Sequence, residues 1–224
     1  MMKIATLNIK KFMLDVDKKQ VFNYLDCLNA DLCIIPEYCL KITNSKVKIC
    51  NPENSTDKRI SFTGVISDIY EIDDKLSKLN KVVLSTKHTP LFNSILGVHI
   101  TDRSTSIEPE EPEYPIVLGD FNTGIDYTRK TDGIGYEFYA ALKSKGYIDL
   151  WEHALTCDKA YYVDYSGVQQ SASPRPFYRT FVSQKRDDFI MCKNDTLELL
   201  NKIVIDYRTL AFTDHCAIIA DFKV

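Results

Sequence analysis

The feature that most constrains the fold is a series of short apolar runs, each followed by a polar side chain that can bind a metal or move a proton. The clearest is PIVLGDFNTG, residues 115–124, where an apolar run leads into Asp120 and Asn122. Short apolar runs bounded by turn residues are typical of buried strands. Other runs are followed in the same way by Asn8, Glu37, His99 and the pair Asp214 and His215. Because functional groups of α/β sheets gather at the carboxyl edge of the strands, this pattern predicts an α/β fold with one polar site.

The N-terminal half contains further signals for strands and one helix. Alternation predicts a strand over 3–9, and Val21, Leu25 and Leu28 lie on one face of a predicted amphipathic helix over 17–30. The β-branched and aromatic residues of 59–72 predict a hairpin around Thr63-Gly64. Three more strands are expected, at 31–38, 81–88 and 92–100.

The C-terminal half begins with 101–115, whose three prolines and glutamate cluster predict a loop. A helix is expected over 135–146, with Gly146 as its C-terminal stop. The next segment, 147–153, is expected to be short and extended or turning. The remaining expectations are a hairpin-like pair over 177–192 and a strand, polar break and second strand over 210–222.

Composition limits the class of protein. The chain has 224 residues with 45% hydrophobic and 26% charged residues, and no low-complexity linker divides it, so we expect a single domain over 1–224. The net charge of -3 excludes polyanion binding through bulk charge, so any nucleic-acid contact must come from a local patch. The longest apolar runs are too short for a membrane span.

The cysteines indicate a reducing compartment. There are seven, an odd number, without a CxxC pair. We therefore expect free thiols in a cytoplasmic protein, and secretion without a signal peptide stays as the alternative. The N-terminal residues have no apolar core long enough for a signal peptide.

Each polar residue after a strand, taken singly, is more typical of a turn than of a site. The combination points elsewhere, because it joins carboxylate and amide oxygens, which suit Mg²⁺ or Mn²⁺, with two imidazoles. Alternation along a strand would point Asp120 and Asn122 to one face and Phe121 into the core.

The ordered motifs resemble the endonuclease/exonuclease/phosphatase superfamily, which includes DNase I. They are TLNI, IIPEY, GVHI, GDFNTG, GYIDLWE, RDDFI and FTDHCAI, spread over nearly the whole chain. The resemblance implies a four-layer α/β/β/α sandwich of two packed mixed sheets, with divalent-metal phosphoester hydrolysis at one edge of the sheets.

The resemblance also implies roles for the matched residues. Asn8 and Glu37 match the principal metal-site pair, and Asp214 matches the third carboxylate on the metal side. Glu37 is expected to be the anionic ligand, and Asn8 to supply a neutral oxygen or a contact to the phosphate. Asp120 is expected to act as the base toward water, and Asn122 to donate a hydrogen bond to the phosphate.

Three further matches complete the expected site. Asp188 is expected to orient His215, which would stabilise the transition state, and His99 would be a second phosphoryl contact or a leaving-group acid. The spacing after Arg186 favours Asp188 over its neighbour Asp187. Whether one or two metals act is left open.

The sequence departs from the family pattern at two positions. Pro36 stands where the family usually has glutamine. His99 matches the histidine found at this position in DNase I and the sphingomyelinases, whereas exonuclease III-type enzymes have a tyrosine there. Glu71 is a candidate partner for His99.

Three functions remain after these matches. The first is a nuclease acting on nucleic acid, the second a sphingomyelinase- or inositol-phosphatase-like phosphoesterase, and the third a non-catalytic binding module. The segment 174–186 favours nucleic acid, because it carries basic and aromatic residues without an acid. Arg175, Tyr178 and Arg179 are its candidate substrate-binding residues, against the alternative of a core hairpin with a solvated basic face.

The short loop 101–115, where the family usually places a helix, predicts self-association through the sheet face beside it.

Overall fold

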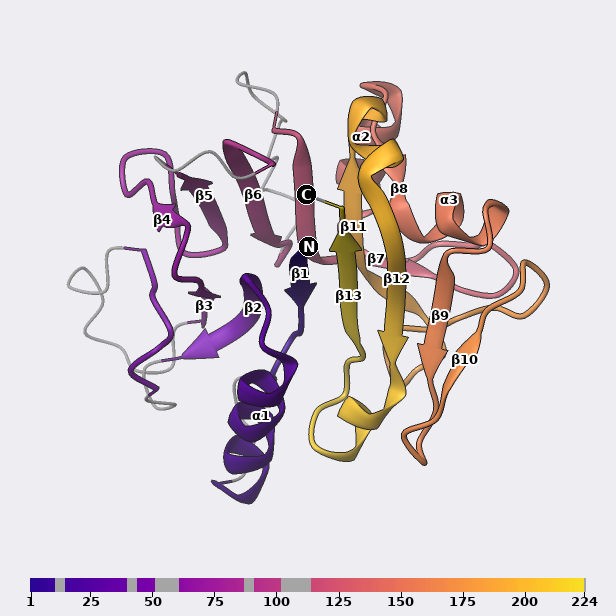
Figure 1. The fold of residues 1–224 in the computed structure, drawn as a ribbon, viewed down its shortest axis with the longest axis horizontal. Coiled ribbons are helices and arrows are strands. Elements are labelled where there is room, and N and C mark those ends of the chain that lie inside the picture. Colours follow the sequence, from indigo (N-terminus) through magenta and orange to yellow (C-terminus); the bar gives the residue numbers. More distant parts are fainter. Residues whose placement is uncertain (11–14, 40–43, 51–60, 87–90, 102–113, 224) are drawn as a thin grey trace.

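Two β-sheets packed face to face form the centre of the computed structural model (Figure 1). It describes residues 1–10, 15–39, 44–50, 61–86, 91–101 and 114–223. The first sheet has seven strands in the order β10-β9-β12-β13-β1-β2-β3, and the second has six in the order β4-β5-β6-β7-β11-β8. The ends of the chain lie side by side, because β1 and β13 pair antiparallel.

The strands of the first sheet are β1 (Met2–Thr6), β2 (Leu32–Cys39), β3 (Ser61–Ile66), β9 (Ala160–Val163), β10 (Gln169–Ser171), β12 (Leu200–Asp206) and β13 (Ala217–Phe222). Those of the second are β4 (Glu71–Ile72), β5 (Lys81–Ser85), β6 (Ser94–His99), β7 (Ile116–Ile125), β8 (Ile148–Asp149) and β11 (Arg186–Cys192). The helices are α1 (Asp15–Leu28), α2 (Tyr136–Ser144) and α3 (Leu150–Thr156), with 3-10 turns η2 (Asn194–Leu199) and η3 (Tyr207–Ala211).

Three apolar clusters define four layers. The largest lies between the sheets and includes Ile34 of β2 and Leu118 of β7. A second lies between the first sheet and α1, and a third between the second sheet and α2, where Phe121 contacts Phe138 and Phe189. The order is therefore α, β, β, α, which confirms the predicted sandwich.

The two predicted long helices are present. Val21 and Leu25 of α1 are buried against the first sheet. Gly146 follows α2 with a φ of 81° and donates its backbone N–H to the carbonyl of Lys143. This left-handed conformation is the usual C-terminal stop of a helix, as the sequence predicted.

The strand β7 is held tightly between β6 and β11. It runs parallel to β6 and antiparallel to β11, so Asp120 has His99 as its neighbour on one side and Asp188 on the other. Gly119 directly before it has a φ of 139°, and a Cβ there would lie 1.9 Å from the carbonyl oxygen of Val98. Only glycine permits this approach, and it brings the backbone of the two strands together at Asp120.

Several local predictions were wrong. No hairpin forms at Thr63-Gly64, because 61–66 is one continuous strand, and the following β4 belongs to the other sheet. The segment expected as a strand before Asp214 is the 3-10 turn η3, and 147–153 contains β8 and the start of α3. The expected hairpin over 177–192 is reduced to a single bridge, Phe181 to Lys185, before β11.

Two expectations about the whole chain have different outcomes. No helix in the described residues is long and apolar enough to cross a membrane. The loop 101–115, on which the prediction of self-association rests, lies almost entirely outside the described residues.

Candidate active site

Both sheets contribute to one polar cluster at their shared edge. Asn8 follows β1, and Glu37 lies in β2. His99 ends β6, and Asp120 and Asp188 lie in β7 and β11. His215 stands just before β13, whose first residues pair with the end of β1. The expected residues thus meet from six separate segments of the chain, although Glu37, Asp120 and Asp188 lie inside strands and not after them.

Asn8 joins the two sheets within this cluster. Its side-chain amide donates to Oδ2 of Asp120 over 2.7 Å and to Oε1 of Glu37 over 3.3 Å. Its Oδ1 accepts the backbone N–H of Lys10, and its backbone carbonyl accepts the hydroxyl of Thr213. Asn8 is fully buried, so these bonds hold its amide in one position.

Glu37 reaches the cluster through an irregularity in β2. The register between β2 and β3 shifts between Ile35 and Tyr38, and Glu37 has a φ of 58°. A bulge of this kind redirects a side chain out of the regular alternation of a strand. Pro36, which cannot donate to a strand ladder, lies inside the same irregularity. The departure from the family pattern therefore falls where the strand is already interrupted.

His99 faces two carboxylates. Its Nε2 lies 3.9 Å from Oε1 of Glu37 and 3.8 Å from Oδ2 of Asp120. The suggested partner Glu71 is not beside it, because Glu71 is exposed on the edge strand β4 and β5 separates that strand from β6. The acids next to His99 are thus members of the same cluster.

Asp188 fixes the position of the His215 imidazole through its Nδ1 atom. Its Oδ2 lies 2.8 Å from Nδ1 of His215, and both side chains are buried. The hydroxyl of Thr180 accepts the backbone N–H groups of both Asp187 and Asp188, which secures the start of β11. The ring of Phe181 packs on the imidazole at 4.7 Å between centroids. These contacts leave Nε2 of His215 directed toward Asp120, at 3.9 Å from its Oδ2.

Burial and like charges shift the proton affinities of this centre. Burial raises the pKa of Asp120 well above its usual value, and the charge of Asp188 raises it further. Burial would lower the pKa of His215, but the charge of Asp188 and the hydrogen bond to it, with smaller effects of Asp120 and Asp214, raise that pKa to about 10. His215 is therefore charged at neutral pH.

Two residues next to this cluster have other hydrogen-bond partners, as predicted for Asp187 and against the prediction for Asn122. Asp187 turns away from His215, and its Oδ1 accepts the backbone N–H of Gly124 over 2.6 Å. Asn122 has a φ of 50°, so β7 departs from regular alternation there, and its side-chain amide donates to the carbonyl of Ile100. Phe121, which stands between Asp120 and Asn122 in the sequence, packs in the core as predicted.

Sequence reasoning missed Lys10 at this site. Its Nζ lies 3.0 Å from Oδ2 of Asp214, and the two side chains are partly exposed. Lys10 has a φ of 54°, which turns the chain sharply after Asn8. A basic residue two positions after Asn8 was visible in the sequence, but its pairing with Asp214 depends on contact between distant segments. Lys10 neutralises one of the carboxylates expected on the metal side.

The donor set fits a divalent cation. Glu37, His99 and Asp120 offer ligand atoms within 4.8 Å of one another, and so do Asp120, Asp188 and His215. The Oδ1 atom of Asp188 is buried without a hydrogen-bond partner among the described residues. Four carboxylates (Glu37, Asp120, Asp188 and Asp214) converge here. Carboxylate oxygens are the ligands that hard divalent cations such as Mg²⁺ and Mn²⁺ prefer, and a cation would offset the negative charge of these four groups.

The candidate substrate residues divide into two kinds. The Tyr178 ring belongs to the core, where it packs on Trp151 at 5.1 Å and on Tyr162 at 5.5 Å, so the expectation that it stands free to stack on a base is corrected. Arg175 is exposed. The guanidinium of Arg179 donates to the Tyr165 hydroxyl and the Val182 carbonyl.

Known structures share this architecture along the full chain. The endonuclease domain of TRAS1, a telomere-specific non-LTR retrotransposon, superposes with a TM-score of 0.66 at 16% identity, covering 99% of this chain and 98% of that one. The 3' phosphatase NExo from Neisseria, bound to a product DNA hairpin, gives 0.64 at 15% identity with both chains fully covered. An AP endonuclease from Archaeoglobus fulgidus gives 0.63 at 14% identity, again with full coverage.

The chain therefore shares the fold of these three structures, the α/β/β/α sandwich that its motifs predicted. No protein-family model and no curated protein sequence matches it. The fold is shared with an endonuclease domain, a 3' phosphatase and an AP endonuclease, and at its sheet edge in this chain lies the cluster of acids and imidazoles.

Proposed function

We propose that this protein is a divalent-metal-dependent phosphodiesterase that cleaves nucleic acid. The observation that carries the proposal is the continuous contact from Asp188 through His215 and Asp120 to Asn8 and Glu37. It joins a buried imidazolium, a carboxylate of raised pKa and a partly exposed acid in one centre. These are the groups that hydrolysis of a phosphodiester by water requires.

Asp120 is the proposed general base. Its raised pKa brings it closer to neutral pH, which favours proton transfer from water. The amide of Asn8 fixes the position of Oδ2, the atom that would take the proton. Asp120 is 1% exposed, so the proton it receives is shielded from bulk water.

His215 is the proposed cationic contact to the phosphoryl group. Asp188 holds Nδ1, so the proton on Nε2 is available to a phosphoryl oxygen as negative charge develops. His99, from the neighbouring strand, would supply a second such contact or protonate the leaving group.

Glu37 would hold the divalent cation. When bound, such a cation offsets the negative charge of the phosphate and orients the scissile bond. Glu37 has about a quarter of its side chain exposed, more than any other carboxylate of the cluster, so it stands nearest to solvent and substrate.

Nucleic acid is the proposed substrate class for two reasons. Three proteins of this fold are described as nucleic-acid enzymes, and one was captured on a DNA hairpin. The segment 174–186 also adds basic residues in a chain of net charge -3. The 3' phosphatase among these proteins favours one second candidate, removal of a terminal phosphate from a nucleic-acid end.

One panel of substrates tests the proposal. The purified protein is assayed with Mg²⁺, with Mn²⁺ and with EDTA on plasmid DNA, single-stranded RNA, an abasic-site duplex, a 3'-phosphorylated oligonucleotide, bis-p-nitrophenyl phosphate, sphingomyelin and inositol phosphates. We expect cleavage of a nucleic acid that EDTA abolishes and that Asp120→Asn reduces by on the order of 10²-fold in kcat. Turnover of the lipid or inositol substrates only, or unchanged activity of Asp120→Asn, would contradict it.

A further inference from the structure

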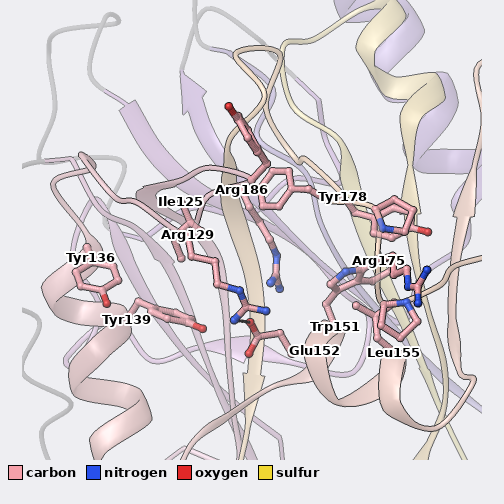
Figure 2. Close-up of a pocket in the computed structure, with 14 residues that line it drawn as sticks. Ile125, Arg129, Tyr136, Tyr139, Trp151, Glu152, Leu155, Arg175, Tyr178 and Arg186 are labelled. Carbon is pink, nitrogen blue, oxygen red and sulfur yellow. Dashed lines mark ion pairs between the residues drawn. The ribbon is translucent and has the colours of Figure 1, made fainter.

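A separate pocket lies on the helical side of β7 and β11. Its volume is about 310 Å³, at the lower end of the range typical of ligand sites. It is bordered by the end of β7, the helices α2 and α3, and the loop before Tyr178. Figure 2 shows the Arg186 side chain directed into its middle, with Tyr136 and Tyr139 on one side and Trp151 and Arg175 on the other.

The lining combines aromatic rings with positive charge. Tyr127, Tyr136, Tyr139, Trp151 and Phe177 contribute rings. Arg129, Arg175 and Arg186 carry the positive charge of the lining, and Glu152 is the acid among the lining residues. Arg186 is also paired with the buried Asp149 at 2.6 Å, and Glu152 is shared between Arg129 at 3.8 Å and Lys143 at 3.5 Å, so the three arginines face two acids, a net of +1 (3 − 2) in a chain of net charge -3. Such a surface suits a flat, anionic ligand.

Arg186 is the second and independent sign of a ligand. It is 6% exposed, and its terminal nitrogen donates to Oδ1 of Asp149 over 2.6 Å. Its Nε is buried without a hydrogen-bond partner among the described residues. A buried donor left unpaired is costly unless another molecule supplies the acceptor.

The pocket is next to the active site along the same strands. Arg186 pairs with Ile125 of β7, whereas Asp188 pairs with Asp120. Arg186 and Asp188 are two positions apart, with Asp187 between them, which amounts to about 7 Å of strand. The bulge between them turns Arg186 to the outer face, where its guanidinium lies over the Phe189 ring at 4.5 Å, while Asp188 faces His215.

We propose that this pocket binds one unstacked base of the nucleic acid whose neighbouring phosphodiester lies at the active site. The base lies among the aromatic rings, and Arg129 and Arg175 hold the phosphates that flank it. This inference rests on the proposed nuclease function. It adds a requirement for a single-stranded or locally opened nucleotide, because a paired base cannot reach the pocket.

Binding in EDTA tests the pocket apart from catalysis. The probe is a fluorescently labelled single-stranded oligonucleotide carrying 2-aminopurine, with anisotropy for the Kd and 2-aminopurine quenching for stacking. Tyr127 is 74% exposed, so Tyr127→Leu leaves the core intact. We expect Tyr127→Leu to weaken binding on the order of tenfold and to relieve the quenching, and Tyr127→Phe, which keeps the ring, to behave as wild type.

Two adjacent basic residues, one lining the pocket and one outside it, give a matched control for the arginines. Arg129→Gln should weaken binding, and Lys130→Gln, an exposed neighbour that does not line the pocket, should not. An oligonucleotide with base-free spacers in place of nucleosides should bind wild type as weakly as the normal oligonucleotide binds Tyr127→Leu. Tight binding of that spacer strand, or wild-type binding by Tyr127→Leu, would overturn the pocket.

Activity separates failure of the pocket from failure of the nuclease proposal. All four variants should hydrolyse bis-p-nitrophenyl phosphate at the wild-type rate. If Tyr127→Leu and Arg129→Gln cleave nucleic acid at the wild-type rate, the proposal that the pocket binds a base is wrong, and the proposed nuclease function stands. Binding that depends on Tyr127, in a protein that cleaves no nucleic acid, overturns the nuclease and leaves a base-binding pocket.

Discussion

Nδ1 of His215 lies 2.8 Å from Oδ2 of Asp188, and the two buried side chains come from segments 27 residues apart. The negative charge of Asp188 outweighs the effect of burial and keeps the imidazole protonated at neutral pH. The pair therefore provides a fixed positive charge facing Asp120. This arrangement underlies the first prediction.

Asp188→Asn should lower the pKa of His215 from about 10 toward its ordinary value of 6.5, because the carboxylate that stabilises the imidazolium is gone. NMR titration of the imidazole in EDTA measures this directly. The kcat should fall on the order of 10²-fold or more in both Asp188→Asn and His215→Ala. An unshifted His215 pKa in Asp188→Asn would show that the contact does not control the charge.

Glu37→Gln should abolish metal-dependent hydrolysis with the fold retained, because the amide removes the anionic oxygen best placed for a cation. Isothermal titration with Mn²⁺ should give weaker binding, and the circular dichroism spectrum should match that of wild type. Glu71→Gln, an exposed acid on β4, is the control and should leave both quantities unchanged. Wild-type turnover in Glu37→Gln would show that Glu37 is not a ligand of the catalytic metal.

Lys10→Met should tighten Mn²⁺ binding if Asp214 serves the metal side, since the ammonium 3.0 Å from Oδ2 competes with the cation for that carboxylate. We expect a several-fold lower Kd in calorimetry, larger at low salt, because the pair is partly exposed and screened. Lys19→Met, an exposed lysine on α1, should have no effect. Unchanged affinity in Lys10→Met would exclude Asp214 as a ligand.

Arg175→Ala and Arg179→Ala should each weaken oligonucleotide binding and flatten its salt dependence, by about 0.7 units of slope on a single strand if each neutralises one phosphate. Within the part of the chain that the structure describes, Arg179 donates only to neutral oxygens, so its charge is not paired there. Hydrolysis of bis-p-nitrophenyl phosphate should be nearly unchanged. Lys223→Ala, at the opposite end of β13 from His215, is the control. Equal loss on both substrates would instead place these arginines in the catalytic centre or the fold.

The thiols should divide sharply by accessibility. None of the seven cysteines, all of which lie in the described residues, forms a disulfide; Cys27 is exposed, Cys157 is partly exposed and the other five are buried. Burial raises the pKa of Cys33 and of Cys192 to about 12, so these thiols stay protonated and unreactive at pH 8. Alkylation of the native protein followed by mass spectrometry should modify Cys27 first and Cys157 next. Modification of Cys33 without denaturant would contradict the packing described for β2.

The sequence predicted most of the candidate site because its residues are tied to local patterns. Asp120 follows a glycine at the point where a buried apolar run approaches its neighbour, and His215 follows a polar break before an apolar strand. Such positions are visible without knowing which strands pair. The two long helices were predicted for the same reason, since the repeat of Val21 and Leu25 and the stop at Gly146 depend only on nearby residues.

The tertiary structure decided what depends on pairing between distant segments. The hairpin expected at Thr63-Gly64 failed because β3 and β4 join different sheets, which local propensity cannot reveal. Lys10 meets Asp214 only because β1 and β13 pair. Arg186 enters the pocket only because β11 is bulged against β7. Local patterns in the sequence indicated which residues form the candidate site. Long-range strand register settled which of them touch, because that register is set by packing of the whole core and not by local preference.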